Sequence, residues 1–140
     1  MTGVSGFLLD TNVLSEIRKK KPDAGVMAFM ESVEPSDLYL SVLSVGEFHK
    51  GVAAKRREDI AAAERLSTWL AGLETGYADR ILSIDPEIAK LWGEWSGERP
   101  RPVIDTLLAA TAVVRQLTLV TRNVRDVEGL PVRVHNPWRG

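Results

Sequence analysis

The sequence has no cysteine among its 140 residues, which excludes disulfide bonds and thiol catalysis and favours a cytoplasmic location. It also lacks an apolar run approaching the ~20 residues of a membrane-spanning helix, and its first residues do not have the basic and apolar segments of a secretory signal. The formal net charge is −1, without the basic surplus that is usual in nucleic-acid-binding proteins. Any contact with nucleic acid therefore depends on local groups of basic residues.

The composition that is present is typical of a folded globular protein. Hydrophobic residues make up 44% of the chain and charged residues 26%, as in ordinary soluble domains. There is no internal repeat, low-complexity tract or long linker. We therefore expect residues 1–140 to form a single domain with a substantial core.

Short apolar runs alternate with longer segments of helical periodicity. Five strands are predicted, at Phe7–Leu9, Leu38–Ser41, Arg80–Ile84, Thr118–Thr121 and Val132–His135. The helices predicted between them cover Val13–Lys19, Asp23–Val33, Ser44–Ala54, Glu58–Tyr77, a segment that begins at Pro86, and Ile104–Gln116. Strands separated by helices indicate an α/β fold, with a mainly parallel sheet of about five strands and helices on both faces.

Four acidic residues fall near the carboxyl ends of the predicted strands, where such a fold places its sites. Asp10 directly follows the first strand, and Asp126 follows the fourth. Glu47 lies about one turn into the helix after the second strand, and Asp105 begins the helix that leads into the fourth. Glu47 and Asp105 stand in apolar sequence, where an unpaired charge is costly to bury.

Each of these four residues also has a simpler interpretation. Asp10 and Asp105 could cap helices, Glu47 could be a solvated helix residue, and Asp126 could belong to an ordinary turn. Independent caps and turns have no reason to converge on one edge of a sheet, so the four together favour a common site. Carboxylates that lie close together repel one another unless a cation compensates them.

The residue types available indicate which cation would suit this site. The ligands are oxygens only, there is no cysteine, and His49 and His135 lack a metal-ligand spacing. This pattern favours Mg²⁺ or Mn²⁺ over zinc. One or two such ions held by carboxylates suit phosphodiester hydrolysis. Trp92 and Trp95, three residues apart, are expected to belong to the core.

The segments LLDTNVLSE, SVLSVGEFHKG, RPVIDTLLAATAVVRQLTLVTRNVRDVEG and VHNPW together resemble the PIN-domain ribonucleases. Within that family the chain looks most similar to the VapC-type toxins of bacterial toxin–antitoxin pairs, including the FitB-like branch. The resemblance implies a PIN-like three-layer α/β/α sandwich and a Mg²⁺- or Mn²⁺-dependent RNA endonuclease. It implies that the catalytic metal ligands are Asp10, Glu47, Asp105 and Asp126, with supporting polar groups at Thr11, Asn12, Thr121 and Asn123.

The resemblance also implies partners. Proteins of this kind form homodimers and are neutralised by a small antitoxin that carries a DNA-binding head. A homodimer and a hetero-oligomer with an antitoxin are therefore expected, and no association with a membrane is expected. RNA is the implied substrate, and an acidic centre binds RNA only if basic residues surround it. The candidates for RNA contact are Arg18, Lys19, Lys50, Arg122 and Arg125, although any single Lys or Arg is more often simply solvated.

Two other functions share part of this pattern. A Mg²⁺-dependent phosphatase would use the same acids, but it needs an acid two residues after its nucleophilic Asp, and this chain has Asn12 there. A non-enzymatic, flavodoxin-like phospho-acceptor regulator would need adjacent acids after the first strand, with Asp85 as the acceptor. Here the first strand ends in the single acid Asp10.

Overall fold

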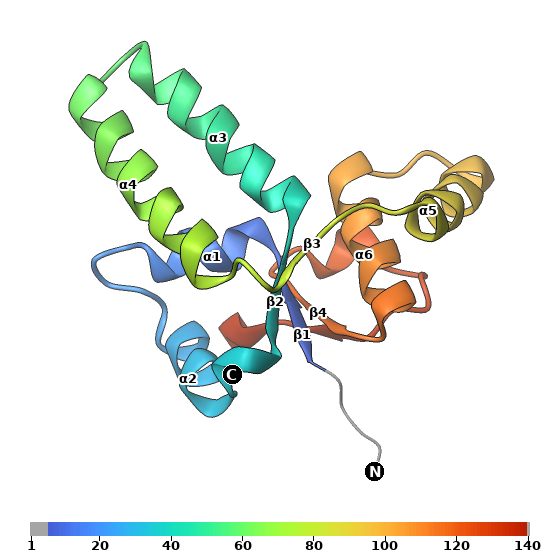
Figure 1. Cartoon of the computed structure of the whole chain (residues 1–140). Helices are drawn as coiled ribbons and strands as arrows, with labels where there is room; N and C mark the ends of the chain where they lie inside the picture. The colour runs from blue at the N-terminus through green and yellow to red at the C-terminus, as the bar shows by residue number, and fades with distance from the viewer. Residues whose placement is uncertain (1–5, 140) are drawn as a thin grey trace.

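A five-stranded sheet lies at the centre of the computed structural model, which describes residues 6–139 (Figure 1). The strands are β1 (Phe7–Leu9), β2 (Leu38–Ser41), β3 (Ile81–Leu82), β4 (Thr118–Val120) and β5 (Val134–His135). Their order is β3-β2-β1-β4-β5, and every pairing is parallel. The predicted α/β class and five-stranded sheet are confirmed, while the order differs from the 2-1-3-4-5 order of flavodoxin-like proteins.

Within residues 6–139 there are six α-helices and three short 3-10 helices, and all but the last 3-10 helix lie between strands. The α-helices are α1 (Thr11–Ile17), α2 (Ala24–Ser32), α3 (Val42–Arg56), α4 (Ile60–Gly76), α5 (Pro86–Glu98) and α6 (Val103–Arg115). The 3-10 helices are η1 (Pro35–Asp37), η2 (Val124–Val127) and η3 (Pro137–Arg139). Within residues 6–139, no helix combines the length and apolar character that crossing a bilayer requires.

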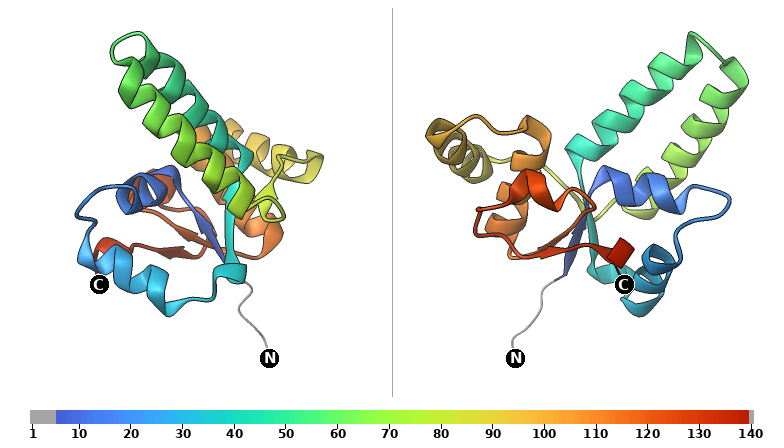
Figure 2. Two further views of the ribbon diagram at one scale, coloured as in Figure 1. Left: turned by 60° about the vertical axis from the view of Figure 1, so that its left-hand side comes forward. Right: turned by 180° about the vertical axis from the view of Figure 1, so that it is seen from behind.

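The core has two halves, one on each face of the sheet. Successive side chains of a strand point to opposite faces, so Leu8 and Leu9 of β1 enter different clusters. Leu9 packs with residues of α1 to α4, whereas Leu8 packs with α5 and α6, including the buried Trp95. Helices therefore cover both faces, as Figure 2 shows, and the predicted three-layer α/β/α arrangement is confirmed.

The hairpin of α3 and α4 projects from the sheet at the carboxyl end of β2 (Figures 1 and 2). Its two helices are held together by an apolar seam in which the rings of Phe48 and Trp69 meet edge to face, with centroids 5.0 Å apart. Ser41 begins α3 by accepting a hydrogen bond from the Leu43 N–H (3.0 Å). Because Ser41 is both the last residue of β2 and the cap of α3, no loop separates the hairpin from the sheet.

The structure corrects several of the predicted boundaries. The first helix begins at Thr11 and ends at Ile17, not at Val13 and Lys19, because Asp10 is its N-cap. The edge strands β3 and β5 contain two residues each and are shorter than predicted, since only one neighbour pairs with each of them. The bounds of β1 and β2 and the start of α5 are as predicted, and those of the other helices and of β4 differ by one or two residues.

Candidate metal and active site

The carboxyl ends of β1 and β4 lie side by side where the sheet changes its direction of growth. From β1 the chain continues to β2 and β3 on one side, whereas β4 and β5 lie on the other. In open α/β sheets, ligands bind at such a switch point. Leu9 pairs with Val120 in the β1–β4 register, so the next residues, Asp10 and Thr121, meet just beyond the sheet. The Thr121 hydroxyl donates a hydrogen bond to Asp10 Oδ2 at 2.6 Å.

Asp10 is buried, with 4% of its surface exposed, and it is held by several donors. The Thr11 N–H donates to Oδ1 (2.6 Å), and Asn12 Nδ2 lies 3.4 Å from Oδ2. Burial raises the pKa of Asp10, although the hydrogen bonds from Thr121 and Thr11 oppose this effect. The residue is thus both the cap of α1 and a fixed carboxylate at the switch point, so the two interpretations of its sequence are compatible.

Glu47 reaches the same place from α3. The Thr11 hydroxyl donates to Glu47 Oε1 at 2.7 Å and also lies within hydrogen-bonding distance of Ser44 Oγ, at 2.9 Å. Glu47 is exposed to solvent, whereas Ser44, one turn earlier in α3, is fully buried. Thr11 therefore joins the first two predicted acids, because its N–H contacts Asp10 and its hydroxyl contacts Glu47.

Asp105 is the third residue of α6 and does not cap it, since Pro102 occupies the N-cap position. Its pKa is raised from the usual 3.8 to about 6, chiefly by burial. The negative charges of Asp10, Asp126 and Glu47 and a side-chain hydrogen bond with Asp126 raise it further. Asp126, in η2, also raises the pKa of Asp10. Glu47 and Asp126 therefore lie close enough to raise the pKa of both Asp10 and Asp105.

A cavity of about 490 Å³ opens at this point. Three of the predicted acids line it, namely Asp10, Glu47 and Asp105, whereas Asp126 is not among the lining residues. The supporting residues Thr11, Asn12 and Asn123 also line it. Thr121 contributes from behind by holding Asp10, and its hydroxyl accepts a hydrogen bond from the Asn123 N–H (2.9 Å).

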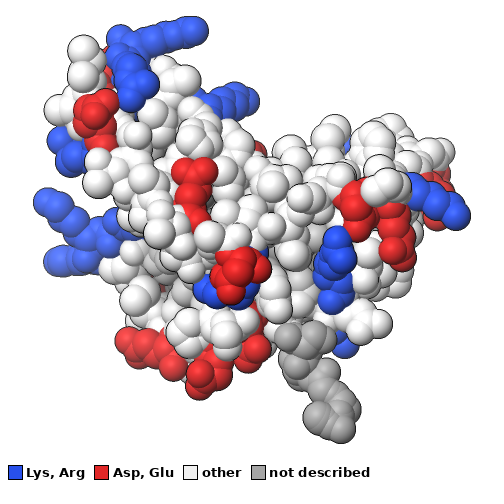
Figure 3. Space-filling model, viewed as in Figure 1, with Lys and Arg blue, Asp and Glu red and all other residues white. Residues whose placement is uncertain are grey.

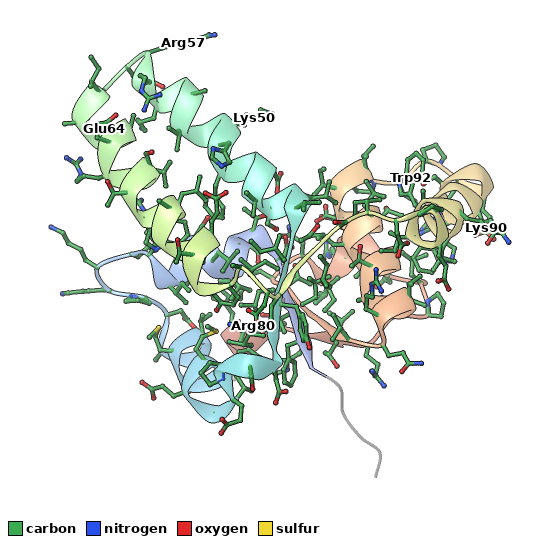
Figure 4. The ribbon with its side chains drawn as sticks, viewed as in Figure 1. Lys50, Arg57, Glu64, Arg80, Lys90 and Trp92 are labelled. Carbon is green, nitrogen blue, oxygen red and sulfur yellow. The ribbon has the colours of Figure 1, made fainter. Side chains whose placement is uncertain are left out.

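Two of the five predicted RNA contacts line the same cavity, Lys19 and Arg122. The guanidinium of Arg18 instead lies over the Trp69 ring, 5.8 Å from its centroid. Lys50 is exposed on the side of α3 away from α4 (Figure 4), and Arg125 is exposed on η2. Other basic side chains gather at the free end of the α3–α4 hairpin (Figure 3).

Three residues of this region are not among the predicted site residues, namely Ser44, Glu16 and Trp138. Glu16 follows Asn12 by four residues and precedes Lys19 by three, a spacing that places them on one helix face. This signal could have identified Glu16. Trp138 reaches the cavity only because η3 packs against α2, which no local pattern reveals.

Comparison with known proteins agrees with this geometry. A family model described as PIN domain matches residues 7–127. The chain belongs to the PIN-domain family. Toxin FitB of Neisseria gonorrhoeae is 33% identical to this PIN domain over 139 residues, which cover 94% of this chain and 98% of FitB. A VapC ribonuclease of Sinorhizobium fredii is 31% identical over 141 residues, which cover 94% of this chain and 97% of the relative.

Solved structures show the same likeness. The crystal structure of FitAcB from Neisseria gonorrhoeae aligns with this PIN domain at a TM-score of 0.78 and 31% identity, covering 96% of this chain and 99% of that one. A toxin–antitoxin complex from Klebsiella pneumoniae aligns at a TM-score of 0.66 and 25% identity, covering 94% and 98%. The PIN-domain resemblance noted in the sequence is thereby confirmed.

The chemistry of this PIN-domain site fits a hard divalent cation. Its donors are carboxylate and hydroxyl oxygens, which Mg²⁺ and Mn²⁺ prefer. Within residues 6–139, none of the four acids forms an ion pair with Lys, Arg or His. No ion pair among these residues therefore offsets their mutual repulsion. Across the same residues, no three Asp, Glu, His or Cys side chains are arranged as a metal-binding group.

Proposed function

We propose that this PIN domain is a Mg²⁺- or Mn²⁺-dependent RNA endonuclease and the toxin of a toxin–antitoxin pair. The observation that carries the proposal is the meeting of Asp10, Glu47, Asp105 and Asp126, from four separate segments, at the switch point of the sheet. The relatives support it, because they are named as a toxin and as a ribonuclease. Hydrolysis of a phosphodiester by metal-activated water suits such a site.

The four acids are proposed to hold the ion, and their neighbours to orient them. Asp10 is the most firmly fixed, since Thr11 and Thr121 each donate to one of its oxygens at 2.6 Å. Thr11 also orients Glu47 (2.7 Å). Asp105 and Asp126 complete the set from α6 and η2. The chemistry that Mg²⁺ supplies when bound is activation of a water and stabilisation of charge on the phosphate and the leaving oxygen.

The partners that we propose follow from the relatives. One similar structure is described as a toxin–antitoxin complex, and a small antitoxin that carries a DNA-binding head is the corresponding partner for this chain. We propose that the protein is a homodimer, both alone and within a larger assembly with the antitoxin. A small neighbouring reading frame that encodes a DNA-binding head would be independent support for the antitoxin.

The experiment that tests the proposed activity compares cleavage of total RNA by the purified protein with Mg²⁺, with Mn²⁺ and with EDTA. The variants Asp10→Asn and Asp105→Asn should be inactive but folded. Asp37→Asn is the matched control, because Asp37 is an exposed acid that directly precedes β2, at the opposite edge of the sheet. This variant should cleave RNA like the unmodified protein.

Two results would contradict the proposal. One is that the protein with either metal cleaves no RNA, and the other is that Asp10→Asn and Asp105→Asn remain active. A small phosphomonoester, assayed in parallel, distinguishes a nuclease from a phosphatase. We expect turnover of RNA and none of the monoester, since no acid stands two residues after Asp10.

A further inference from the structure

Arg122 and Trp138 line the cavity wall without taking part in holding the carboxylates. The Arg122 guanidinium lies over the Trp138 ring, with its central carbon 5.2 Å from the ring centroid. This is the geometry of a cation–π contact, which requires a distance within about 6 Å. Arg122 directly follows Thr121, whose hydroxyl contacts Asp10. This cation–π pair therefore adjoins the proposed site of cleavage.

The surrounding structure fixes the Trp138 ring. Trp138 is partly buried and packs against the core cluster on the α1–α4 face of the sheet. Its backbone N–H donates to Asn136 Oδ1 at 3.0 Å. Nearby, the His135 and Phe29 rings lie with centroids 5.1 Å apart, joining β5 to α2. Trp138 is thus a rigid apolar platform at the edge of the cavity.

The Arg122 side chain, by contrast, is exposed, and its hydrogen-bonding capacity is unused. Within residues 6–139, its guanidinium makes no hydrogen bond and no ion pair, and only its backbone N–H has a partner, Asn12 Oδ1 at 3.5 Å. Arginine carries five N–H donors in a flat, permanently charged group. A flat cation that is held on a fixed ring, with free donors, is ready to receive a planar ligand that carries negative charge.

A neighbouring buried acid adds to this arrangement. Glu16 has 6% of its surface exposed, accepts a hydrogen bond from Lys19 Nζ at 3.0 Å and another from the Asp23 N–H at 2.8 Å. Lys19 lowers the pKa of Glu16 most strongly, and the charge of Arg122 lowers it further. Glu16 therefore holds Lys19 in the cavity wall by a direct ion pair, and Arg122 lies close enough for its charge to lower the pKa of Glu16.

We propose that Arg122 contacts the substrate by stacking on the base of the nucleotide next to the scissile phosphate, and that Trp138 is a positioning residue that holds the guanidinium flat. This inference rests on the proposed RNA endonuclease function. Bases of single-stranded RNA stack on arginine planes and aromatic rings regardless of their identity. The layered contact of Trp138, Arg122 and base gives affinity for unpaired RNA without selecting a sequence.

The test compares binding of two ligands of equal length, a random-sequence RNA and an abasic ribose-phosphate oligomer. A length of about 12 nucleotides falls within the site sizes of single-strand binders. Fluorescence anisotropy in Ca²⁺ reports affinity with a hard cation present. The variants are Arg122→Lys, which keeps the charge but not the plane, and Trp138→Leu and Trp138→Phe. Arg57→Lys, at the tip of the α3–α4 hairpin (Figure 4), is the matched control.

We expect the unmodified protein to bind RNA about 10-fold more tightly than the abasic oligomer. Arg122→Lys and Trp138→Leu should lose this preference and leave affinity for the abasic oligomer unchanged, whereas Trp138→Phe should retain most of it. In cleavage assays the same two variants should raise KM with little change in kcat. Arg57→Lys should behave like the unmodified protein in both assays.

The inference is overturned if Arg122→Lys retains the preference for RNA, or if it weakens both ligands equally, which would indicate a phosphate contact alone. A fall in kcat at constant KM would also overturn it. Because Arg122 is exposed, its variant tests the inference even if Trp138→Leu fails to fold. A protein that cleaves RNA normally but shows no preference for bases would refute this inference and leave the proposed activity intact.

Discussion

Replacing Asp105 by Asn should stabilise the metal-free protein while abolishing RNA cleavage. Burial and three neighbouring acids raise the pKa of Asp105 from 3.8 to about 6, so its charged form is less favourable in the folded protein than in the unfolded chain. Converted directly, this difference corresponds to roughly 3 kcal/mol. Asp105 is only half-buried, and solvent screening reduces the expected gain to about 1 kcal/mol.

The size of this effect depends on pH. Between about pH 4 and pH 6 the folded state holds a proton on Asp105 that the unfolded chain has released. The free energy of unfolding therefore falls as pH rises through this window. Asp105→Asn carries no such proton, so it should match the unmodified protein near pH 4 and exceed it above pH 6. The raised pKa of Asp10 acts in the same direction but is present in both proteins.

Thermal unfolding in EDTA, followed by calorimetry at several pH values, measures this difference. For a chain of this size, 1 kcal/mol corresponds to a change in Tm of about 3 to 5 °C. Asp37→Asn is again the control and should leave Tm unchanged at every pH. The reasoning is refuted if Asp105→Asn is less stable than the unmodified protein in EDTA at neutral pH, or if its advantage does not vary with pH.

Three further outcomes follow from the same site. Thr121→Val removes the donor to Asp10 Oδ2 and the acceptor of the Asn123 N–H, so kcat should fall about 10- to 100-fold. The control Thr118→Val should leave kcat unchanged, and equal kcat values for Thr121→Val and the unmodified protein would contradict this prediction. Mg²⁺ at about 100 times its Kd should stabilise the protein by about 2.7 kcal/mol. This should raise the Tm of the unmodified protein, whereas the Tm of Asp105→Asn should not change on addition of Mg²⁺. At subsaturating Mg²⁺, cleavage should increase as pH rises through about 6, because protons and the ion compete for Asp105; a rate that falls over this range would oppose the account.

Much of the fold could be predicted from periodicity. The central strands β1 and β2 have the predicted bounds, because each is a short apolar run that ends in a polar capping residue. The edge strands β3 and β5 were predicted too long. Their length is set by pairing with a single neighbour, which is a tertiary property that no local pattern records.

The acidic part of the site could also be predicted, since the carboxyl ends of parallel strands meet at one edge. What could not be predicted is how the acids are supported. Ser44 beside Thr11, and Trp138 beneath Arg122, depend on packing between segments far apart in the sequence. From the sequence, Asp10 could be read either as a helix cap or as a site residue. The hydrogen bonds show that the carboxylate that caps α1 also contacts Thr121 at the switch point, so the two interpretations do not exclude each other.

The most direct test of the central claim is the affinity for Mn²⁺, measured by isothermal titration calorimetry on the unmodified protein and on four single variants. These are Asp10→Asn, Glu47→Gln, Asp105→Asn and Asp126→Asn. If the four carboxylates hold one metal centre, each variant should bind Mn²⁺ at least about 10-fold more weakly, and Asp37→Asn should bind it normally. Mn²⁺ affinity that is unchanged in these four variants would contradict the account.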